Sequence, residues 1–311
     1  MKKILITAIG GDIAQSVALL IRKYFSNIDI IGCDFKNQKI EKKFIDKFIL
    51  VPKASNTYYI NKLNYFINKM SIDLVLPMNE DELNVISKNI ELLNKKKIII
   101  PNKNIIKIGV DKFKTYKELK KLGLIVPWTV LSKSSMPMEY PCIVKPRKGS
   151  GGKKVRIINN KKEASDFYEK RGYIFQELLT PSKKEFTCAV HRNKKGEVRS
   201  LILLRKLTNG YTSWAKVIES KEIEKICKYL ANEFGLFGSI NIQLIQTKNG
   251  PKIFEINPRF SSTVLMRDKV SFQDLKWTIQ EYVGAKVHYK NSLMNRILIK
   301  KSLSNIEVLK V

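Results

Sequence analysis

Cysteine and histidine are scarce in this chain of 311 residues, and neither forms a metal-binding pattern. The four cysteines are far apart and include no C-x-x-C pair: Cys33, Cys142, Cys188 and Cys227. This spacing argues against a zinc site and fits buried free thiols in a reducing compartment, so we expect a cytoplasmic protein. The two histidines, His191 and His288, need no catalytic role, and we interpret His191 as a structural or surface residue.

Long hydrophobic runs are also missing. No apolar run approaches the ~20 residues of a membrane-spanning helix, so no membrane association is expected. Residues 1–8 resemble the start of a signal peptide, but Gly10-Gly11-Asp12 ends the apolar run early. A first β-strand is therefore the better interpretation. A hydrophobic content of 44% excludes general disorder, and the length allows one large core or two to three smaller ones.

Acidic residues are few: 28 Asp and Glu stand against 58 Lys and Arg, which gives a net charge of +30. Such a balance invites a nucleic-acid hypothesis, which predicts salt-sensitive binding to any duplex. However, the lysines are scattered through every segment, and no nucleic-acid-binding motif is present. We favour a solvated basic surface that attracts anionic ligands such as nucleotides, and we expect no nucleic acid partner.

The first third of the chain alternates strands and helices. Residues 2–8 predict a strand, Gly10 and Gly11 a tight turn, residues 16–24 a helix and residues 28–34 a second strand. Further strands are expected at residues 48–52, 74–77 and 97–101, with a helix at residues 58–70. This order predicts a doubly wound parallel sheet in an α/β domain over residues 1–102. The full G-x-G-x-x-G fingerprint is absent, so dinucleotide binding is a weak prediction.

An acidic cluster, Asn79-Glu80-Asp81-Glu82, follows the strand at residues 74–77. Ligands usually bind at the carboxyl ends of strands in open α/β sheets, so Glu80 is a candidate for holding a substrate amine. The cluster equally fits the first turn of a helix, where acids interact favourably with the helix dipole.

Residues 240–260 contain the strongest chemical pattern. Two apolar runs flank Lys248-Asn249-Gly250-Pro251, which predicts an antiparallel hairpin. Glu255 and Asn257 share one face of the second strand, and Gln243 can share that face from the first strand. These oxygen donors suit Mg²⁺ rather than zinc, and Arg259 follows as a fixed cation. The alternative is a half-polar edge hairpin with a solvated face.

A second pattern lies at residues 140–155. A strand ends at Lys145-Pro146 and is followed by a loop with three glycines, Gly149, Gly151 and Gly152. The free N–H groups of such a loop can surround phosphate oxygens, although the Walker A spacing is not met. A glycine-rich basic hairpin tip without a ligand is the alternative. Upstream, Asp111-Lys112-Phe113 opens a helix that Gly123 closes.

The remaining chain predicts strands at residues 173–179, 185–190 and 200–204, and helices at 220–234 and 272–282. The basic tail beyond Gly284 is expected to add one or two closing strands. We divide this α+β part into a segment 103–190, with a linker helix, and a segment 191–311, with the hairpin and the tail.

Taken in order, these pieces resemble the ATP-grasp superfamily. They look most like the single-chain members related to the carbamoyl-phosphate synthase large subunit and biotin carboxylase. The resemblance runs from Met1 to about Gly284 and rests on an ordered series of short motifs: Asp111-Lys112, Ile143-Val144-Lys145-Pro146, Gly149 to Gly152, Gln176-Glu177-Leu178-Leu179, Gln243, and Glu255-Ile256-Asn257-Pro258-Arg259.

The resemblance implies ATP and one or two Mg²⁺ ions, for which Mn²⁺ can substitute. Lys112 and Lys145 would contact phosphates, and a loop would close over the triphosphate through Lys148, Gly149, Ser150, Gly151 and Gly152. The adenine and ribose pocket would be lined by Gln176, Glu177, Leu178, Leu179 and Glu185. Gln243, Glu255 and Asn257 would bind the metal, and Arg259 would stabilise the transferred phosphoryl group.

The reaction implied is ATP-dependent ligation, in which a small-molecule carboxylate becomes an acylphosphate that an amine, or a thiol, then attacks. Candidates for gripping the carboxylate are Arg205, Lys206 and Arg267, unless they are simply exposed basic side chains. The sequence leaves the oligomeric state open, and a homodimer is one option because related enzymes are commonly dimers. The segment Phe260 to Val264 departs from the synthase pattern of small residues. This departure keeps open an alternative, a nucleotide-sensing or scaffold protein that has lost the reaction.

Overall fold

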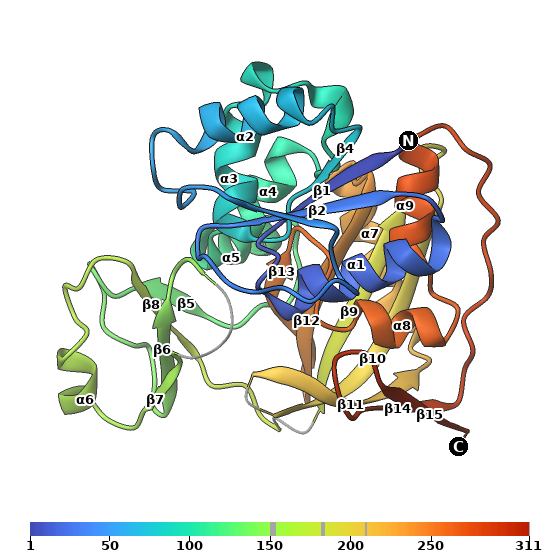
Figure 1. Cartoon of the computed structure of the whole chain (residues 1–311). Coiled ribbons are helices and arrows are strands. Elements are labelled where there is room, and N and C mark those ends of the chain that lie inside the picture. The colour runs from blue at the N-terminus through green and yellow to red at the C-terminus, as the bar shows by residue number, and fades with distance from the viewer. Residues whose placement is uncertain (150–153, 182–183, 209, 311) are drawn as a thin grey trace.

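The computed structural model describes residues 1–149, 154–181, 184–208 and 210–310, and these form three sheets (Figure 1). The first sheet is parallel, and the other two are antiparallel. The predicted order of an α/β domain followed by an α+β part is therefore confirmed. No helix within the described ranges is long and apolar enough to cross a membrane.

The N-terminal sheet has the strand order β3-β2-β1-β4. Its parallel strands are β1 (Lys3–Thr7), β2 (Asp29–Asp34), β3 (Lys47–Leu50) and β4 (Leu74–Leu76). Successive side chains of β1 point to opposite faces, and both faces are buried: Ile4 and Ile6 join one core, and Leu5 joins another. This explains why β1 is a continuous apolar run rather than an alternating one.

Helices cover both faces of this sheet, as a doubly wound fold requires. One face packs against α1 (Asp12–Tyr24), and the other against α2 (Tyr59–Lys69) and α3 (Glu80–Lys88). Later in the chain, α8 (Val264–Lys269) and α9 (Asp274–Tyr282) also contact α1. The predicted strand at residues 97–101 is wrong: Lys95–Lys97 forms a 3₁₀ turn, and Ile98 makes an isolated bridge with Val75.

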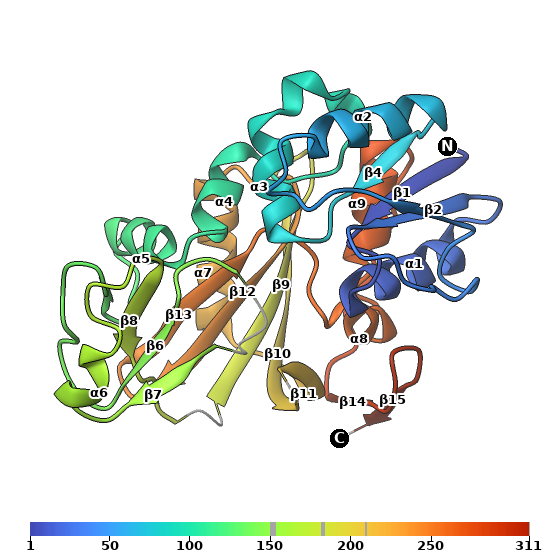
Figure 2. The same cartoon turned by 60° about the vertical axis from the view of Figure 1, so that its left-hand side comes forward.

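Two short helices, α4 (Lys103–Gly109) and α5 (Lys112–Lys121), lead to the second sheet, whose order is β5-β8-β6-β7. Its strands are β5 (Thr129–Leu131), β6 (Cys142–Pro146), β7 (Arg156–Ile158) and β8 (Tyr173–Glu177), with α6 (Lys161–Ser165) packed on it. Figure 2 shows this small sheet beside the hairpin formed by β12 and β13.

The third sheet has seven strands in the order β13-β12-β9-β10-β11-β14-β15. They are β9 (Glu185–Arg192), β10 (Val198–Thr208), β11 (Tyr211–Ile218), β12 (Gly238–Thr247), β13 (Gly250–Asn257), β14 (Arg296–Lys300) and β15 (Ile306–Lys310). One or two closing strands were expected in the basic tail, and the strands β14 and β15 confirm this. The segment boundary that we predicted at residue 190 falls inside β9, so the break between the two antiparallel sheets lies before Glu185.

One face of the large sheet carries a continuous apolar core under α7 (Lys221–Glu233), where Cys188, Ile242 and Leu244 meet Ile223 and Leu230. The predicted amphipathic helix is confirmed, with Ser220 as its N-cap. On the opposite face the middle strands pack their small and apolar side chains against α8 and α9. All four cysteines are buried and free, as their spacing suggested.

Candidate functional site

The hairpin predicted at residues 240–260 is confirmed as β12 and β13. Gln243 pairs with Glu255 and Asn241 pairs with Asn257, and a bulge follows at Gln243/Leu244. Residues paired across an antiparallel ladder point to the same face. Gln243, Glu255 and Asn257 therefore share one face, as the period-two argument predicted.

That face of the large sheet has a polar end and an apolar end. Thr187 pairs with both Gln243 and Leu203, so Glu185 and Arg205, each two residues away along its strand, belong to the same face. Toward the other end Ala189 and Leu201 pack under α8 and α9. The polar end thus gathers side chains from four neighbouring strands, and the site lies there.

Lys112 enters this site from the start of α5. Its Nζ lies 3.7 Å from Glu255 Oε1 and donates a hydrogen bond to the carbonyl oxygen of Gly149. Asp111 fixes this end of the helix, because its carboxylate accepts from the backbone N–H groups of Phe113 and Lys114. The same carboxylate accepts from Arg147 Nε at 2.8 Å. The helix start and the loop after β6 are therefore tied together at Lys112.

Gly109 explains how α4 approaches the hairpin so closely. A Cβ at this position would lie 2.8 Å from the carbonyl oxygen of Ile256 and 2.8 Å from Pro258 Cδ. Only glycine fits here without a shift of the backbone, because any side chain would collide with β13 and Pro258. The close packing at Gly109 in turn places α5 and Lys112 beside Glu255. Our sequence reasoning missed Gly109, since a single glycine at a helix end carries no signal about a distant strand.

Lys145, at the end of β6, faces the hairpin from the small sheet. It is only 5% exposed, and its ammonium group lies 5.5 Å from the centroid of the Phe254 ring. Burial lowers the pKa of Lys145 to about 8, against the opposing effect of Glu255. Lys252 on β13 also contacts Glu177 on β8, with Nζ 2.6 Å from Oε1, so the two sheets are joined beside the site.

Arg259 connects the site to the N-terminal domain. Its Nη2 lies 2.5 Å from Glu80 Oε1 and 3.5 Å from Asn257 Oδ1, and its Nη1 donates to the carbonyl oxygen of Phe260. Glu80 begins α3, whose N-cap Asn79 accepts from Asp81 N at 2.8 Å. The acidic cluster therefore forms the first turn of a helix, and within it Glu80 also pairs with Arg259.

Glu82, two residues after Glu80, is buried and accepts a hydrogen bond from Thr7 Oγ1 at the end of β1. Burial raises its pKa to about 7, and the hydrogen bond from Thr7 opposes this shift.

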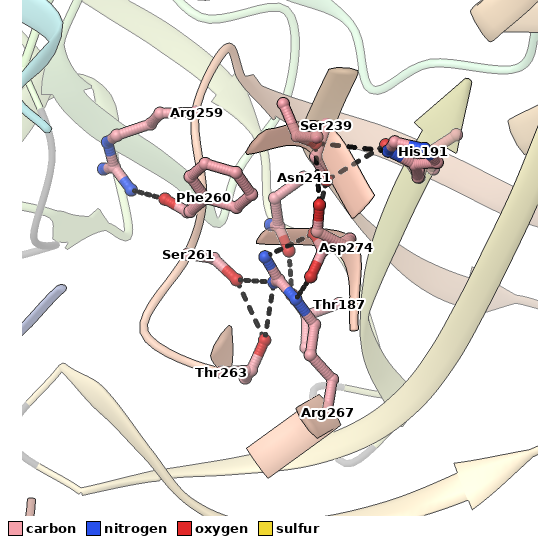
Figure 3. A network of polar contacts seen from close by, with 12 residues as sticks. Thr187, His191, Ser239, Asn241, Arg259, Phe260, Ser261, Thr263, Arg267 and Asp274 are labelled. Carbon is pink, nitrogen blue, oxygen red and sulfur yellow. Dashed lines mark hydrogen bonds and ion pairs between the residues drawn. The ribbon is translucent and has the colours of Figure 1, made fainter. Parts of the chain in front are cut away.

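Arg267 does not reach the site, and this corrects its assignment as a substrate residue. Its side chain is fully buried. Its Nε donates to Asp274 Oδ1 and its Nη2 donates to Asp274 Oδ2, each at 2.7 Å (Figure 3). Its remaining nitrogen, Nη1, donates to Ser261 Oγ at 3.0 Å and lies 3.5 Å from Thr263 Oγ1. Arg267 thus anchors the segment that follows Arg259, and it accounts for the hydroxyl residues that departed from the synthase pattern.

His191 lies on the far side of the same network (Figure 3). It is fully buried, and burial lowers its pKa to about 4, so the ring is neutral at neutral pH. Its Nε2 lies 3.9 Å from Glu281 Oε2, and a neutral ring forms no ion pair there. Asp274 also accepts from Ser239 Oγ. The interpretation of His191 as a structural residue is confirmed.

The other predicted residues are dispersed around the site. Gln176 is buried and donates from Nε2 to Thr129 Oγ1 at 2.8 Å. Glu177 donates its backbone N–H to Trp128 O, and its carboxylate contacts Lys252. Leu179 is buried and Leu178 partly exposed.

Three predicted loop residues, Ser150, Gly151 and Gly152, lie outside the described residues. Lys148 and Gly149 are exposed beside them. Lys206 is exposed and covers the ring of Trp214, with Nζ 5.0 Å from the ring centroid.

The donor set at the hairpin fits Mg²⁺ bound together with phosphates. Within the ranges described above, no three His, Cys, Asp or Glu side chains cluster in a way that would hold a metal alone. Glu255 and Asn257 offer a carboxylate and an amide oxygen on one face, and Mg²⁺ usually combines one or two carboxylates with substrate phosphates.

Two family models match the chain. The model described as an ATP-grasp domain matches residues 110–263, which include Lys112, Lys145, the hairpin and Arg259. The chain therefore contains an ATP-grasp domain. The ATP-grasp domain follows residues 4–100, which match the model described as a PylC-like N-terminal domain.

Proteins similar to this ATP-grasp chain include the formate-dependent phosphoribosylglycinamide formyltransferase of Ignicoccus hospitalis. It is 23% identical over 270 residues, covering 73% of this chain and 65% of that protein. The chain spans 65% and 66% of the length of the first two curated relatives that it matches.

Solved structures share the fold. N5-carboxyaminoimidazole ribonucleotide synthetase from Thermotoga maritima has a TM-score of 0.71 and 20% identity, over 96% of this chain and 80% of that one. L-amino acid ligase from Bacillus licheniformis has a TM-score of 0.77 and 16% identity, over 96% and 79%. At these identities the likeness shows the fold alone.

Proposed function

We propose that this ATP-grasp chain is an ATP-dependent ligase that activates a small-molecule carboxylate as an acylphosphate and transfers the acyl group to an amine. The observation that carries the proposal is the convergence of Lys112, Lys145, Glu255, Asn257 and Arg259 on one site. Phosphoryl transfer depends on positioning and charge neutralisation more than on a covalent catalyst. The names of the similar proteins, a formyltransferase, a synthetase and a ligase, are consistent with this class.

Three cations of the site, Lys112, Arg205 and Arg259, are each paired with an acid. Lys112 lies beside Glu255, Arg205 beside Glu185, and Arg259 beside Glu80. These pairs keep the long side chains in place before a nucleotide arrives, which lowers the entropic cost of binding. Lys145 is held by burial instead.

In the proposed first step, a carboxylate oxygen of the substrate attacks the γ-phosphorus of ATP, and the bond to the bridging oxygen of ADP breaks. Lys112 and Lys145 neutralise the phosphate oxygens, and Arg259 stabilises the transferred phosphoryl group. Glu255 and Asn257 would hold Mg²⁺, which supplies charge stabilisation to the phosphates when bound.

In the second step, the lone pair of the amine attacks the acyl carbon, inorganic phosphate leaves with the bonding electrons, and the amine releases a proton. The substrate residue that we propose is Glu80, because its pair with Arg259 places it in the polar cluster. Lys206 is a weaker candidate, since it packs on Trp214 at the sheet edge.

The experiment is a screen of ADP release over pairs of carboxylates and amines, with mass spectrometry of the product. Glu255→Ala is expected to reduce turnover by several orders of magnitude, because the metal carboxylate is lost. Glu219→Ala, which removes a carboxylate that follows β11, is the matched control and should retain wild-type turnover. The Glu255→Ala protein should keep the wild-type circular dichroism spectrum.

Two results would count against the proposal. Undiminished turnover of Glu255→Ala with the true substrate pair would contradict the role of the hairpin. ATP binding without ADP release across a broad panel would favour the alternative, a nucleotide-sensing protein of the same fold.

A further inference from the structure

Arg205 occupies one flank of the proposed metal site. It is 9% exposed, and its Nε and Nη2 both donate to Glu185 Oε1. The same Nη2 donates to Gln243 Oε1 at 3.0 Å. The oxygen that the sequence offers as a metal ligand is therefore already the acceptor of a buried guanidinium group.

A guanidinium group at this place acts as a permanent cation. Guanidinium groups stay protonated in proteins, so Arg205 keeps its charge when a metal ion approaches. A divalent ion on Gln243 would share one oxygen with this cation and be repelled by it. Glu185 balances the charge of Arg205, but it is the cationic end of the pair that meets Gln243.

The carboxylates of the site lead to the same conclusion. Glu255 is the single acid in the sequence from Gly238 to Asn257. The next acid on this face, Glu185, is occupied by Arg205. One carboxylate plus phosphate oxygens suits one Mg²⁺ ion. A second ion would have to use Gln243 Oε1, which accepts a 3.0 Å hydrogen bond from Arg205, whereas Asn257 Oδ1 lies at the longer distance of 3.5 Å from Arg259 Nη2.

We infer that the site binds a single divalent cation, held by Glu255 and Asn257, and that Arg205 on Gln243 supplies the positive charge on the other side of the phosphates. This inference rests on the proposed function, because it concerns how ATP is bound. It assigns Arg205 to phosphate binding, and Gln243 to the orientation of Arg205 rather than to metal ligation.

The test is a Mn²⁺ titration with a non-hydrolysable ATP analogue, adenylyl imidodiphosphate, followed by the electron paramagnetic resonance of free Mn²⁺. Wild-type protein is expected to bind one Mn²⁺ per chain in the presence of the analogue. Gln243→Ala should still bind one Mn²⁺, with an affinity within about threefold of wild type. Asn257→Ala should weaken the binding of Mn²⁺ more than about tenfold. Removing a residue that only supports a metal ligand typically lowers metal affinity about 10–100-fold, and removing a direct ligand should lower it at least as much.

A double variant tests the exchange of charge directly. Arg205→Met with Gln243→Glu removes the guanidinium group and adds a carboxylate, and it should bind two Mn²⁺ per chain. Circular dichroism checks that the variants fold. The number of Mn²⁺ ions bound by wild-type protein tests the inference even if a variant does not fold.

The inference would be overturned by two tightly bound Mn²⁺ ions in wild-type protein, or by loss of Mn²⁺ binding in Gln243→Ala. Both results leave the ligase proposal intact, because nucleotide binding, measured separately by calorimetry, would persist. Absence of nucleotide binding in wild-type protein would overturn the ligase proposal as well.

Discussion

The buried pair Arg267–Asp274 provides a quantitative test of how the segment after Arg259 is held. Arg267 is 0% exposed and Asp274 1% exposed, and two parallel hydrogen bonds of 2.7 Å join them. The change Arg267→Met keeps most of the side-chain volume and removes the charge. It leaves the Asp274 carboxylate buried with Ser239 as its remaining donor, and it removes the donor to Ser261.

The expected cost is large. Breaking a buried ion pair by removing one partner destabilises proteins by about 3–5 kcal/mol, since the remaining charge is left uncompensated. A typical domain has only about 5–15 kcal/mol of stability, so Arg267→Met should be marginally folded. The exposed pair Arg22–Asp46, with side chains 32% and 46% exposed, is a matched control. Arg22→Met should cost less than about 1 kcal/mol.

Urea denaturation measures both free energies of unfolding. A double-mutant cycle then separates the pair from its surroundings, because Arg267→Met with Asp274→Asn removes both charges. The double variant should be at least about 1 kcal/mol more stable than the sum of the single changes predicts. A cost below about 1 kcal/mol for Arg267→Met, or additivity in the cycle, would refute the anchoring role.

Three further predictions concern single positions. Lys145 has a pKa of about 8 in the free protein, so it loses its charge as the pH rises above 8. The dissociation constant for ATP, measured by calorimetry, should therefore rise up to about tenfold per pH unit above pH 8. Lys145→Arg, which stays protonated, should abolish this dependence on pH. Glu82→Gln should raise the free energy of unfolding by about 3 kcal/mol at pH 8.5 but by less than about 1 kcal/mol at pH 5, as followed by urea denaturation. The sign follows because the folded pKa of about 7 exceeds the ordinary 4.5, so the folded state binds more protons between these values and loses stability as pH rises; an equal effect at both pH values would contradict it. Gly109→Ala should lower the free energy of unfolding by about 1–3 kcal/mol, because the added Cβ would lie 2.8 Å from Ile256 O. In the control Gly11→Ala the added Cβ would lie 3.4 Å from its nearest neighbour, and the free energy of unfolding should change by less than about 0.5 kcal/mol. Equal unfolding midpoints for the two variants would contradict the close contact at Gly109.

Local pattern was sufficient for much of the fold and part of the site. The alternation around Gly250 predicted the hairpin and the shared face of Glu255 and Asn257, because side chains two residues apart on a strand point to the same face. Asp111 predicted the start of α5, since an N-cap is a contact within four residues. These predictions depended on interactions between neighbours in the sequence.

The errors involve partners on other elements or weak local signals. Arg267 and Arg205 were equivalent as candidate substrate residues. Asp274, the partner of Arg267, is seven residues away but on the next helix, and the partners of Arg205, Glu185 and Gln243, are 20 and 38 residues away. The segment 97–101 has the apolar residues that favour a strand, but it pairs with β4 through a single isolated bridge. Propensity does not determine how long a strand pairs with its neighbour.

The proposed reaction transfers the γ-phosphoryl group of ATP to a carboxylate. Once the screen has identified a substrate pair, the carboxylate is labelled with ¹⁸O in both oxygens, and the released phosphate is analysed by mass spectrometry. Activation through an acylphosphate predicts one ¹⁸O atom in each phosphate released, because the attacking oxygen leaves with phosphorus. Phosphate that contains no ¹⁸O, with ADP formed at the same rate, would contradict the account.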